Sequence, residues 1–197
     1  MDTRIDHHLS TNRPRGKVLG MGNALVDLIF HLESDQILQE FGLPKGSMTL
    51  IGQEKAREIL DHFENKADAV ITGGSASNTI TAIATMGGEC GFIGRTGKGD
   101  IYADFYTDYF KKHGIRTHFS QTDIQTGTAI TLMSPDTERT FATYLGAAAT
   151  LSEHDIKAEI FEDYDIFHIE GYMVQNHALM ERAISSAKQK GLKISLD

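Results

Sequence analysis

The 197-residue sequence has one cysteine, three prolines and no tryptophan, and basic residues are outnumbered by acidic ones. The single cysteine, Cys90, excludes an intrachain disulfide and a cysteine-based zinc site, and its apolar neighbours predict a buried thiol. The 19 lysines and arginines face 27 acids, and the formal net charge of -8 argues against a nucleic-acid or anionic-membrane surface. No apolar run reaches the roughly 18 residues of a membrane helix, and no secretory signal is visible. We therefore expect a soluble, cytoplasmic protein that binds neither nucleic acid nor membrane.

The remaining composition is that of an ordinary globular domain, with 40% apolar and 23% charged residues. Residues 1–16 are polar, and we expect a flexible extension in which His7 and His8 are solvated rather than metal ligands. From residue 17 onward, apolar strand patterns alternate with helical ones, which predicts an α/β domain with a mostly parallel sheet flanked by helices. Strands are expected near 17–30, 47–51, 69–71, 91–94, 165–169 and 192–197, and helices near 36–44, 53–65, 76–86, 100–113, 152–161 and 176–190.

Residues 128–145 have a different pattern from the rest of the chain. Two strand-like segments, 128–133 and 139–144, flank a turn that contains Pro135 and Asp136, which predicts an antiparallel hairpin. A hairpin within an alternating α/β chain indicates a lid attached to a parallel sheet. We expect this lid to include residues near 36–51 and 128–145.

The turn at Gly73-Gly74 is the first candidate for a ligand site. It lies between an apolar run and a helical segment, where glycines permit close backbone approach and a helix N-terminus favours oxygen-rich groups. A strand-to-helix turn capped by a serine is an equally good interpretation.

Three polar residues in or just after strand patterns raise similar alternatives. Asp27, between Val26 and Leu28, either faces water on an edge strand or accepts hydrogen bonds from ligand hydroxyls. His168 is either a hydrogen-bonded core residue or a catalyst, and the core interpretation is favoured. Glu170 follows a predicted strand, at the edge of a parallel sheet where ligands bind.

Three separated motifs resemble the ribokinase-like (PfkB) family of sugar and nucleoside kinases. The first comprises Gly73, Gly74, Ala76, Asn78, Gly87 and Gly97, with Ile80 in place of the small residue that the family prefers. Residues 20–27 are similar to the first-strand motif of adenosine kinases, and residues 144–148 to the segment that returns from their lid. The resemblance covers residues 17–197 and implies the N-terminal portion of a ribokinase-like fold, most similar to adenosine kinases.

The resemblance assigns roles at the sugar end of a binding site. It implies that Asp27 accepts hydrogen bonds from two sugar hydroxyls, a role that suits the several lone pairs of a carboxylate. It also implies that Gly73, Gly74 and Asn78 hold the same sugar, with Ser75 nearby.

Other matched positions imply contacts with the base or with the sugar edge. Asn23 would lie beside either group, and Glu170 corresponds to a sugar-contacting acid in ribokinases that adenosine kinases often lack. The remaining matched positions would form an apolar cover and wall: Met48, Leu50, Leu145, Ala147, Tyr172 and Met173.

The chemistry implied by the resemblance is transfer of the γ-phosphoryl group of ATP, with Mg²⁺, to a sugar or nucleoside hydroxyl. The catalytic aspartate base is expected C-terminal to Asp197, so these 197 residues alone are expected to be inactive. Gly97-Lys98-Gly99-Asp100 superficially resembles the anion-hole motif of the family, but its position in the chain is wrong. Alternatives are a kinase for another sugar such as fructose, or a non-catalytic sugar- or nucleoside-binding module. A monomer and a homodimer formed through the lid are both compatible with the resemblance.

Overall fold

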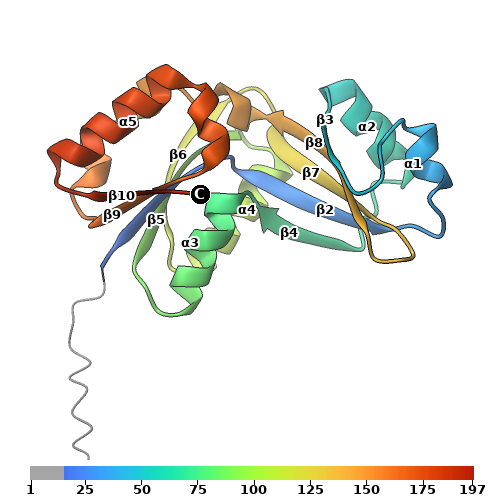
Figure 1. The fold of residues 1–197 in the computed structure, drawn as a ribbon, viewed down its shortest axis with the longest axis horizontal. Helices are drawn as coiled ribbons and strands as arrows, with labels where there is room; N and C mark the ends of the chain where they lie inside the picture. Colours follow the sequence, from blue (N-terminus) through green and yellow to red (C-terminus); the bar gives the residue numbers. More distant parts are fainter. Residues whose placement is uncertain (1–15) are drawn as a thin grey trace, which may run out of the picture.

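The computed structural model describes residues 16–197, which form two five-stranded sheets with helices packed around them (Figure 1). The expected extension, with His7 and His8, lies outside the described residues apart from Gly16. The first sheet is entirely parallel, in the order β10-β9-β1-β5-β6. Its strands are β1 (Val18–Met21), β5 (Cys90–Gly97), β6 (Arg116–Thr122), β9 (Ile166–Ile169) and β10 (Lys193–Leu196).

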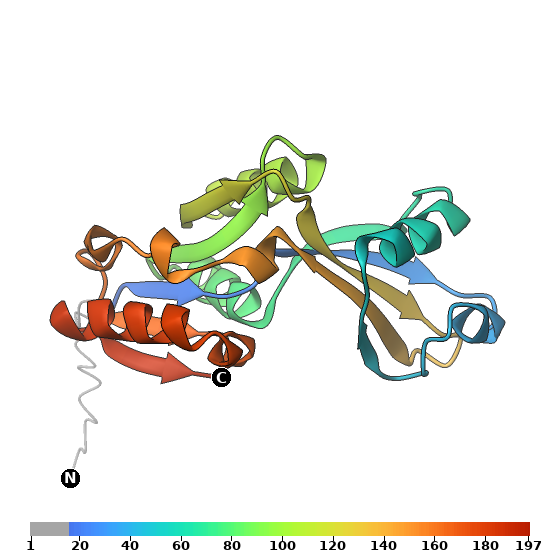
Figure 2. The same cartoon turned by 90° about the horizontal axis from the view of Figure 1, so that it is seen from above.

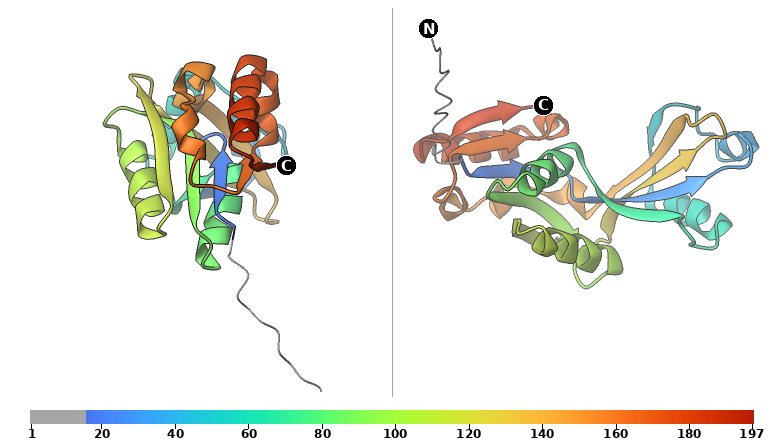
Figure 3. Two further views of the ribbon diagram at one scale, coloured as in Figure 1. Left: turned by 90° about the vertical axis from the view of Figure 1, so that its left-hand side faces the viewer. Right: turned by 90° about the horizontal axis from the view of Figure 1, so that it is seen from below.

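Helices cover both faces of the parallel sheet, as Figures 2 and 3 show. Successive residues of β1 point to opposite faces, so Leu19 and Met21 pack with the cluster that includes α5 (His177–Gln189). Val18 belongs to the other cluster, with α3 (Ser75–Thr85) and α4 (Ile101–Lys112). The sheet is therefore buried on both sides, as parallel sheets generally are.

The aromatic side chains of α4 belong to this core, which confirms their interpretation as packing residues. Tyr106 and Phe110 are fully buried, and the Phe92 ring meets Phe110 edge to face with centroids 5.4 Å apart. Cys90 is also buried, as predicted.

The second sheet is mixed, in the order β3-β8-β7-β2-β4. Its strands are β2 (Leu25–His31), β3 (Met48–Leu50), β4 (Ala69–Gly73), β7 (Thr126–Met133) and β8 (Arg139–Gly146). The antiparallel pairing of β7 with β8 confirms the predicted hairpin. The predicted lid strands, the β7–β8 hairpin and β3, form only part of this sheet, because β2 and β4 also belong to it. The short helix α1 (Gln36–Glu40) and α2 (Gln53–His62) contribute Leu38, Ala56 and Ile59 to the core on one of its faces.

The prediction of one strand over 17–30 is wrong. The chain leaves the parallel sheet after Met21, turns through residues 22–24, and enters the mixed sheet at Leu25. A Cβ atom on Gly22 would lie 2.5 Å from the Glu170 carboxylate, and the Asn23 side chain donates to that same carboxylate. Close packing of Gly22 against Glu170 and the hydrogen bond from Asn23 fix the turn at which the chain leaves β1.

The predicted α-helix over 152–161 is also wrong. The structure has two short 3₁₀ helices there, η2 (Glu153–Asp155) and η3 (Ala158–Phe161). The capping box of Ser152 and Asp155 is present, but the Asp155 carboxylate also pairs with Arg95 on β5 at 2.9 Å. The short helix η2 is therefore attached to the parallel sheet through Asp155 and Arg95. Two further 3₁₀ helices are η1 (Ala147–Thr150) and η4 (Gly171–Gln175).

Within residues 16–197, every helix is too short or too polar to cross a membrane.

Candidate functional site

A cavity of about 860 Å³ lies where the carboxyl ends of β1 and β9 meet the mixed sheet. This edge of a parallel sheet is the usual ligand position in open α/β folds. Its walls come from the β1–β2 turn, the N-terminus of α3, β3, β8, and the segment from η4 into α5. The lining residues are Asn23, Leu25, Met48, Leu50, Gly74, Ser75, Thr143, Leu145, Ala148, Ala149, Leu151, Glu170, Tyr172, Met173, Gln175, Asn176, His177 and Leu179.

Most of the predicted site residues line this one cavity, although they come from distant parts of the chain. They are Asn23, Met48, Leu50, Gly74, Ser75, Leu145, Glu170, Tyr172 and Met173. Four predicted residues are not among the lining residues, namely Asp27, Gly73, Asn78 and Ala147.

Glu170 is the most buried polar group of the site, with 1% of the residue exposed. Its carboxylate accepts a hydrogen bond from Asn23 Nδ2 at 2.6 Å and longer ones from the backbone amides of Asn23 and Ala76. Burial raises the pKa of Glu170, and these hydrogen bonds partly oppose that shift. Glu170 therefore ties the end of β9 to the β1–β2 turn and to the first turn of α3.

Neighbouring atoms approach both glycines of the turn too closely for any side chain to fit there. A side chain at Gly73 would collide with the carboxylate of Asp27, and one at Gly74 with the backbone carbonyl of Asn23. Gly74 also has a φ of 95°, a conformation that only glycine adopts without strain. Tyr106, buried beneath the turn, donates from its hydroxyl to the Gly73 carbonyl at 3.1 Å. The turn is thus fixed by its neighbours before any ligand binds.

Asp27 is half-buried on an internal strand, so the interpretation of an edge strand facing water is wrong. β2 pairs with β4 on one side and with β7 on the other. Alternation along the strand places Asp27 on the same face as Leu25, which lines the cavity. Burial raises the pKa of Asp27 to about 6, and the positive charge of Arg139 partly opposes that shift.

The structure does not bring Asn78 or Ala147 to the cavity. Asn78 is exposed one turn along α3 and lines a separate hollow of about 520 Å³ beside β4 and α4. The cavity meets α3 only at its N-terminal end, so residues further along the helix lie beyond it. Ala147 is fully buried, and its neighbours Ala148 and Ala149 line the cavity in its place.

Several residues of the site were not predicted from the sequence. Leu25 was detectable, because it lies two residues before Asp27 on the same strand face. The segment Gln175-Asn176-His177 carries no recognisable signal in the sequence. Asp197 also escaped prediction, although its carboxylate accepts a hydrogen bond from the Ser75 hydroxyl at 2.8 Å.

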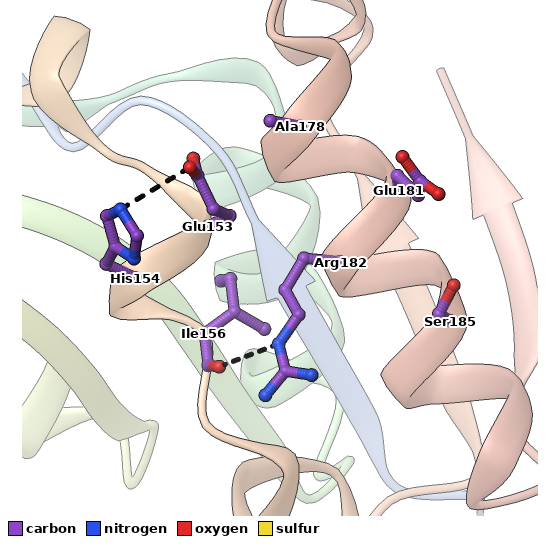
Figure 4. A pocket seen from close by; sticks show the side chains of 7 residues that line it. All are labelled: Glu153, His154, Ile156, Ala178, Glu181, Arg182 and Ser185. Atoms are coloured by element: carbon purple, nitrogen blue, oxygen red, sulfur yellow. Dashed lines mark hydrogen bonds and ion pairs between the residues drawn. The ribbon is translucent and has the colours of Figure 1, made fainter.

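A third hollow, of about 650 Å³, lies between η2 and α5, apart from the predicted residues (Figure 4). Three of its lining side chains are engaged locally: Arg182 donates to the carbonyl of Ile156 at 3.4 Å, and His154 lies 3.5 Å from Glu153.

Asp100, in the segment that superficially resembles an anion hole, has a structural role. Its carboxylate caps α4 through the amides of Tyr102 and Ala103, and it also accepts from the amide and hydroxyl of Thr126. With both oxygens engaged, Asp100 is unsuited to act as a base.

The parallel sheet, the mixed sheet beside its carboxyl edge and the cavity between them define an α/β protein of the sugar- and nucleoside-kinase class. A family model described as "pfkB family carbohydrate kinase" matches residues 47–197, and the chain belongs to this family.

Relatives of the chain are kinases of sugars and ribosides. It is 30% identical over 122 residues to the aminoimidazole riboside kinase of Salmonella typhimurium, a match covering 59% of this chain and 37% of that protein. It is 26% identical over 132 residues to the probable fructokinase-5 of Arabidopsis thaliana, covering 64% of this chain and 40% of that protein.

Solved structures agree with this assignment. A probable sugar kinase from Rhizobium etli superimposes with a TM-score of 0.80 at 28% identity, covering 92% of this chain and 56% of that one. The adenosine kinase of Sinorhizobium meliloti gives a TM-score of 0.79 at 26% identity, covering 93% and 56%. The chain therefore spans about half the length of the proteins it matches.

Proposed function

We propose that this chain supplies the acceptor-binding part of a kinase that transfers the γ-phosphoryl group of ATP to a hydroxyl of a sugar or nucleoside. The observation that carries the proposal is one cavity whose lining combines polar groups with apolar side chains. Its volume of about 860 Å³ lies in the range of pockets that hold whole small molecules.

The polar lining suits a sugar with several hydroxyls. Ser75, Asn23 and Gly74 line the cavity, and Asp27 lies against Gly73 beside it. A carboxylate can accept hydrogen bonds from two hydroxyls at once, a role that we assign to Asp27. Glu170 has its oxygens engaged by Asn23 and Ala76, so we assign it to shaping the site rather than to contacting the sugar.

The apolar lining favours a nucleoside over a bare sugar. Met48 and Leu50 of β3 are 45% and 60% exposed, and Tyr172 of η4 is 64% exposed, yet all three line the cavity. A planar base between these side chains would bury apolar surface, which contributes about 25 cal/mol of favourable free energy per Å² buried. We propose that β3 and the β7–β8 hairpin act as the lid over that base.

We assign none of residues 16–197 to the phosphoryl-transfer step. The described residues contain no group of three or more His, Cys, Asp or Glu side chains placed to hold a metal ion. We derive no step through Mg²⁺, which in such sites is held by one or two carboxylates together with the phosphates.

A thermal-shift comparison of adenosine, inosine, ribose and fructose tests the proposal. A ligand at 100 times its Kd stabilises the native state by about 2.7 kcal/mol, which raises Tm by roughly 5–10 °C for a chain of this size. We expect adenosine or inosine to give the largest rise. Asp27→Asn should reduce the rise to about half or less at the same ligand concentration, and Asp108→Asn, at an exposed position on α4 outside the cavity, is the matched control.

The similarity to a probable fructokinase supports a second candidate, in which the acceptor is a bare sugar. A larger shift with fructose or ribose than with either nucleoside would favour that candidate. No shift with any of the four compounds would refute both.

A further inference from the structure

Asp197, which follows β10, connects two walls of the cavity. Its Oδ2 accepts a hydrogen bond from the Ser75 hydroxyl at the start of α3, at 2.8 Å. Its Oδ1 accepts one from the backbone amide of Gly171 at the start of η4, also at 2.8 Å. Ser75 lines the cavity on one side, and η4 carries the lining residues Tyr172 and Met173. One carboxylate thus holds both walls.

Gly171 and Asp197 also pack closely through their backbones. A Cβ atom on Gly171 would lie 2.5 Å from the backbone carbonyl of Asp197, and the amide of Asp197 donates to the carbonyl of Ile169 at 3.3 Å. η4 therefore sits directly against the end of β10.

The contact with Ser75 fixes the direction of that hydroxyl. Burial alone would raise the pKa of Asp197, but the hydrogen bonds from Gly171 and Ser75 and the proximity of His168 outweigh it and lower the pKa. An ionised carboxylate only accepts hydrogen bonds, so Ser75 must donate its one proton to Asp197. The lone pairs of Ser75 are then left to accept a hydrogen bond from a ligand.

Two other titratable groups face Asp197. His168 Nε2 lies 3.9 Å from Oδ2, too far for a hydrogen bond, while His168 Nδ1 lies 3.2 Å from the Ser195 hydroxyl. Glu170 is close enough that the charge of Asp197 raises its pKa. Neither group competes with Ser75 for the Asp197 carboxylate.

We propose that Asp197 is a positioning residue of the acceptor site, which makes Ser75 an obligate acceptor for a ligand hydroxyl and holds η4 against the N-terminus of α3. The inference rests on the proposed function, because the ligand hydroxyl belongs to the sugar. It goes further in stating which partner of the hydrogen bond at Ser75 must donate.

The test is a double-mutant cycle in the full chain, with adenosine and ribose titrated by calorimetry. Asp197→Asn keeps an acceptor for the Gly171 amide but can turn an NH₂ group toward Ser75, which reverses the Ser75 hydrogen bond. We expect affinity to fall roughly 2- to 13-fold, the usual net worth of one neutral hydrogen bond. In a Ser75→Ala background, the same substitution should change affinity less than about 2-fold.

Equal losses from Asp197→Asn in both backgrounds would show a merely structural role and overturn the proposal. Wild-type affinity in Ser75→Ala would overturn it too. Hydrogen exchange at the Gly171 amide tests the second contact: protection should persist in Asp197→Asn and be lost in Asp197→Ala. Unchanged protection in Asp197→Ala would refute the hold on η4.

If the wild-type chain binds none of adenosine, inosine, ribose and fructose, the proposed function fails, and an NMR titration of the Asp197 carboxyl decides the inference separately. Its pKa should rise in Ser75→Ala if Ser75 donates to it. An unchanged pKa would contradict the arrangement of hydrogen bonds on which the inference depends.

Discussion

Replacing Asp27 by asparagine should stabilise the fold while weakening ligand binding. Burial raises the pKa of Asp27 from 3.8 to about 6. Because a tenfold change in an equilibrium constant corresponds to 1.36 kcal/mol, this rise in pKa means that the ionised carboxylate costs the native state about 3 kcal/mol. Asparagine has nearly the same shape, so it fits beside Gly73 without that cost.

The pH dependence follows from the sign of the shift. The folded-state pKa is above the unfolded-state value, so the destabilisation is absent below pH 4, grows between pH 4 and 6, and is complete above pH 6. Asp27→Asn should therefore match the wild type in unfolding free energy near pH 4 and exceed it by up to about 3 kcal/mol at pH 7. Urea unfolding at a series of pH values measures this difference.

Binding should change in the opposite direction. A hydrogen bond to a charged group is worth about 1.5–3 kcal/mol, so Asp27→Asn should lose roughly 13- to 160-fold in affinity for adenosine at pH 7. Asp108→Asn should change neither quantity by more than about 0.5 kcal/mol. A variant that is less stable than the wild type at pH 7, or that binds equally well, would refute this account of Asp27.

Three further substitutions test other parts of the site. Gly74→Ala should destabilise the chain by at least 1 kcal/mol in urea unfolding, because of its positive φ and the nearby Asn23 carbonyl; a neutral result would contradict the rigid turn. Glu170→Ala should cost about 1–3 kcal/mol by leaving the Asn23 amide group buried and unpaired, and a stability within 0.5 kcal/mol of the wild type would argue against its role. Leu50→Ala should weaken adenosine binding in calorimetry but leave ribose binding unchanged, because the proposal assigns the apolar lining residue Leu50 to the base; equal losses for both would place the base elsewhere.

Much of the architecture was predictable because it depends on local patterns. The alternation of strands and helices, the hairpin of β7 and β8, and the amphipathic α2 are all recorded in apolar spacing and turn residues. Hydrophobic spacing does not specify which strands pair, however. This is why residues 17–30 were expected to form one strand and instead join two sheets through the turn at Gly22 and Asn23.

The site was predictable in its residue types and less so in its geometry. The motifs selected Asn23, Ser75 and Glu170 from distant segments, and the structure places all three on one cavity. Asn78 lies outside the cavity because the cavity meets only the N-terminal end of α3, and no local sequence pattern encodes that position. The hydrogen bond between Ser75 and Asp197 joins residues 122 positions apart in the chain, so only the folded structure reveals it.

A crystal structure of the full chain with adenosine tests the central claim most directly. We predict that the ribose hydroxyls lie within hydrogen-bond distance of Asp27 and Ser75, with the adenine between Leu50 and Tyr172. Adenosine in the hollow between η2 and α5, or with its base against Ser75 and its ribose against Leu50, would contradict the proposed acceptor site.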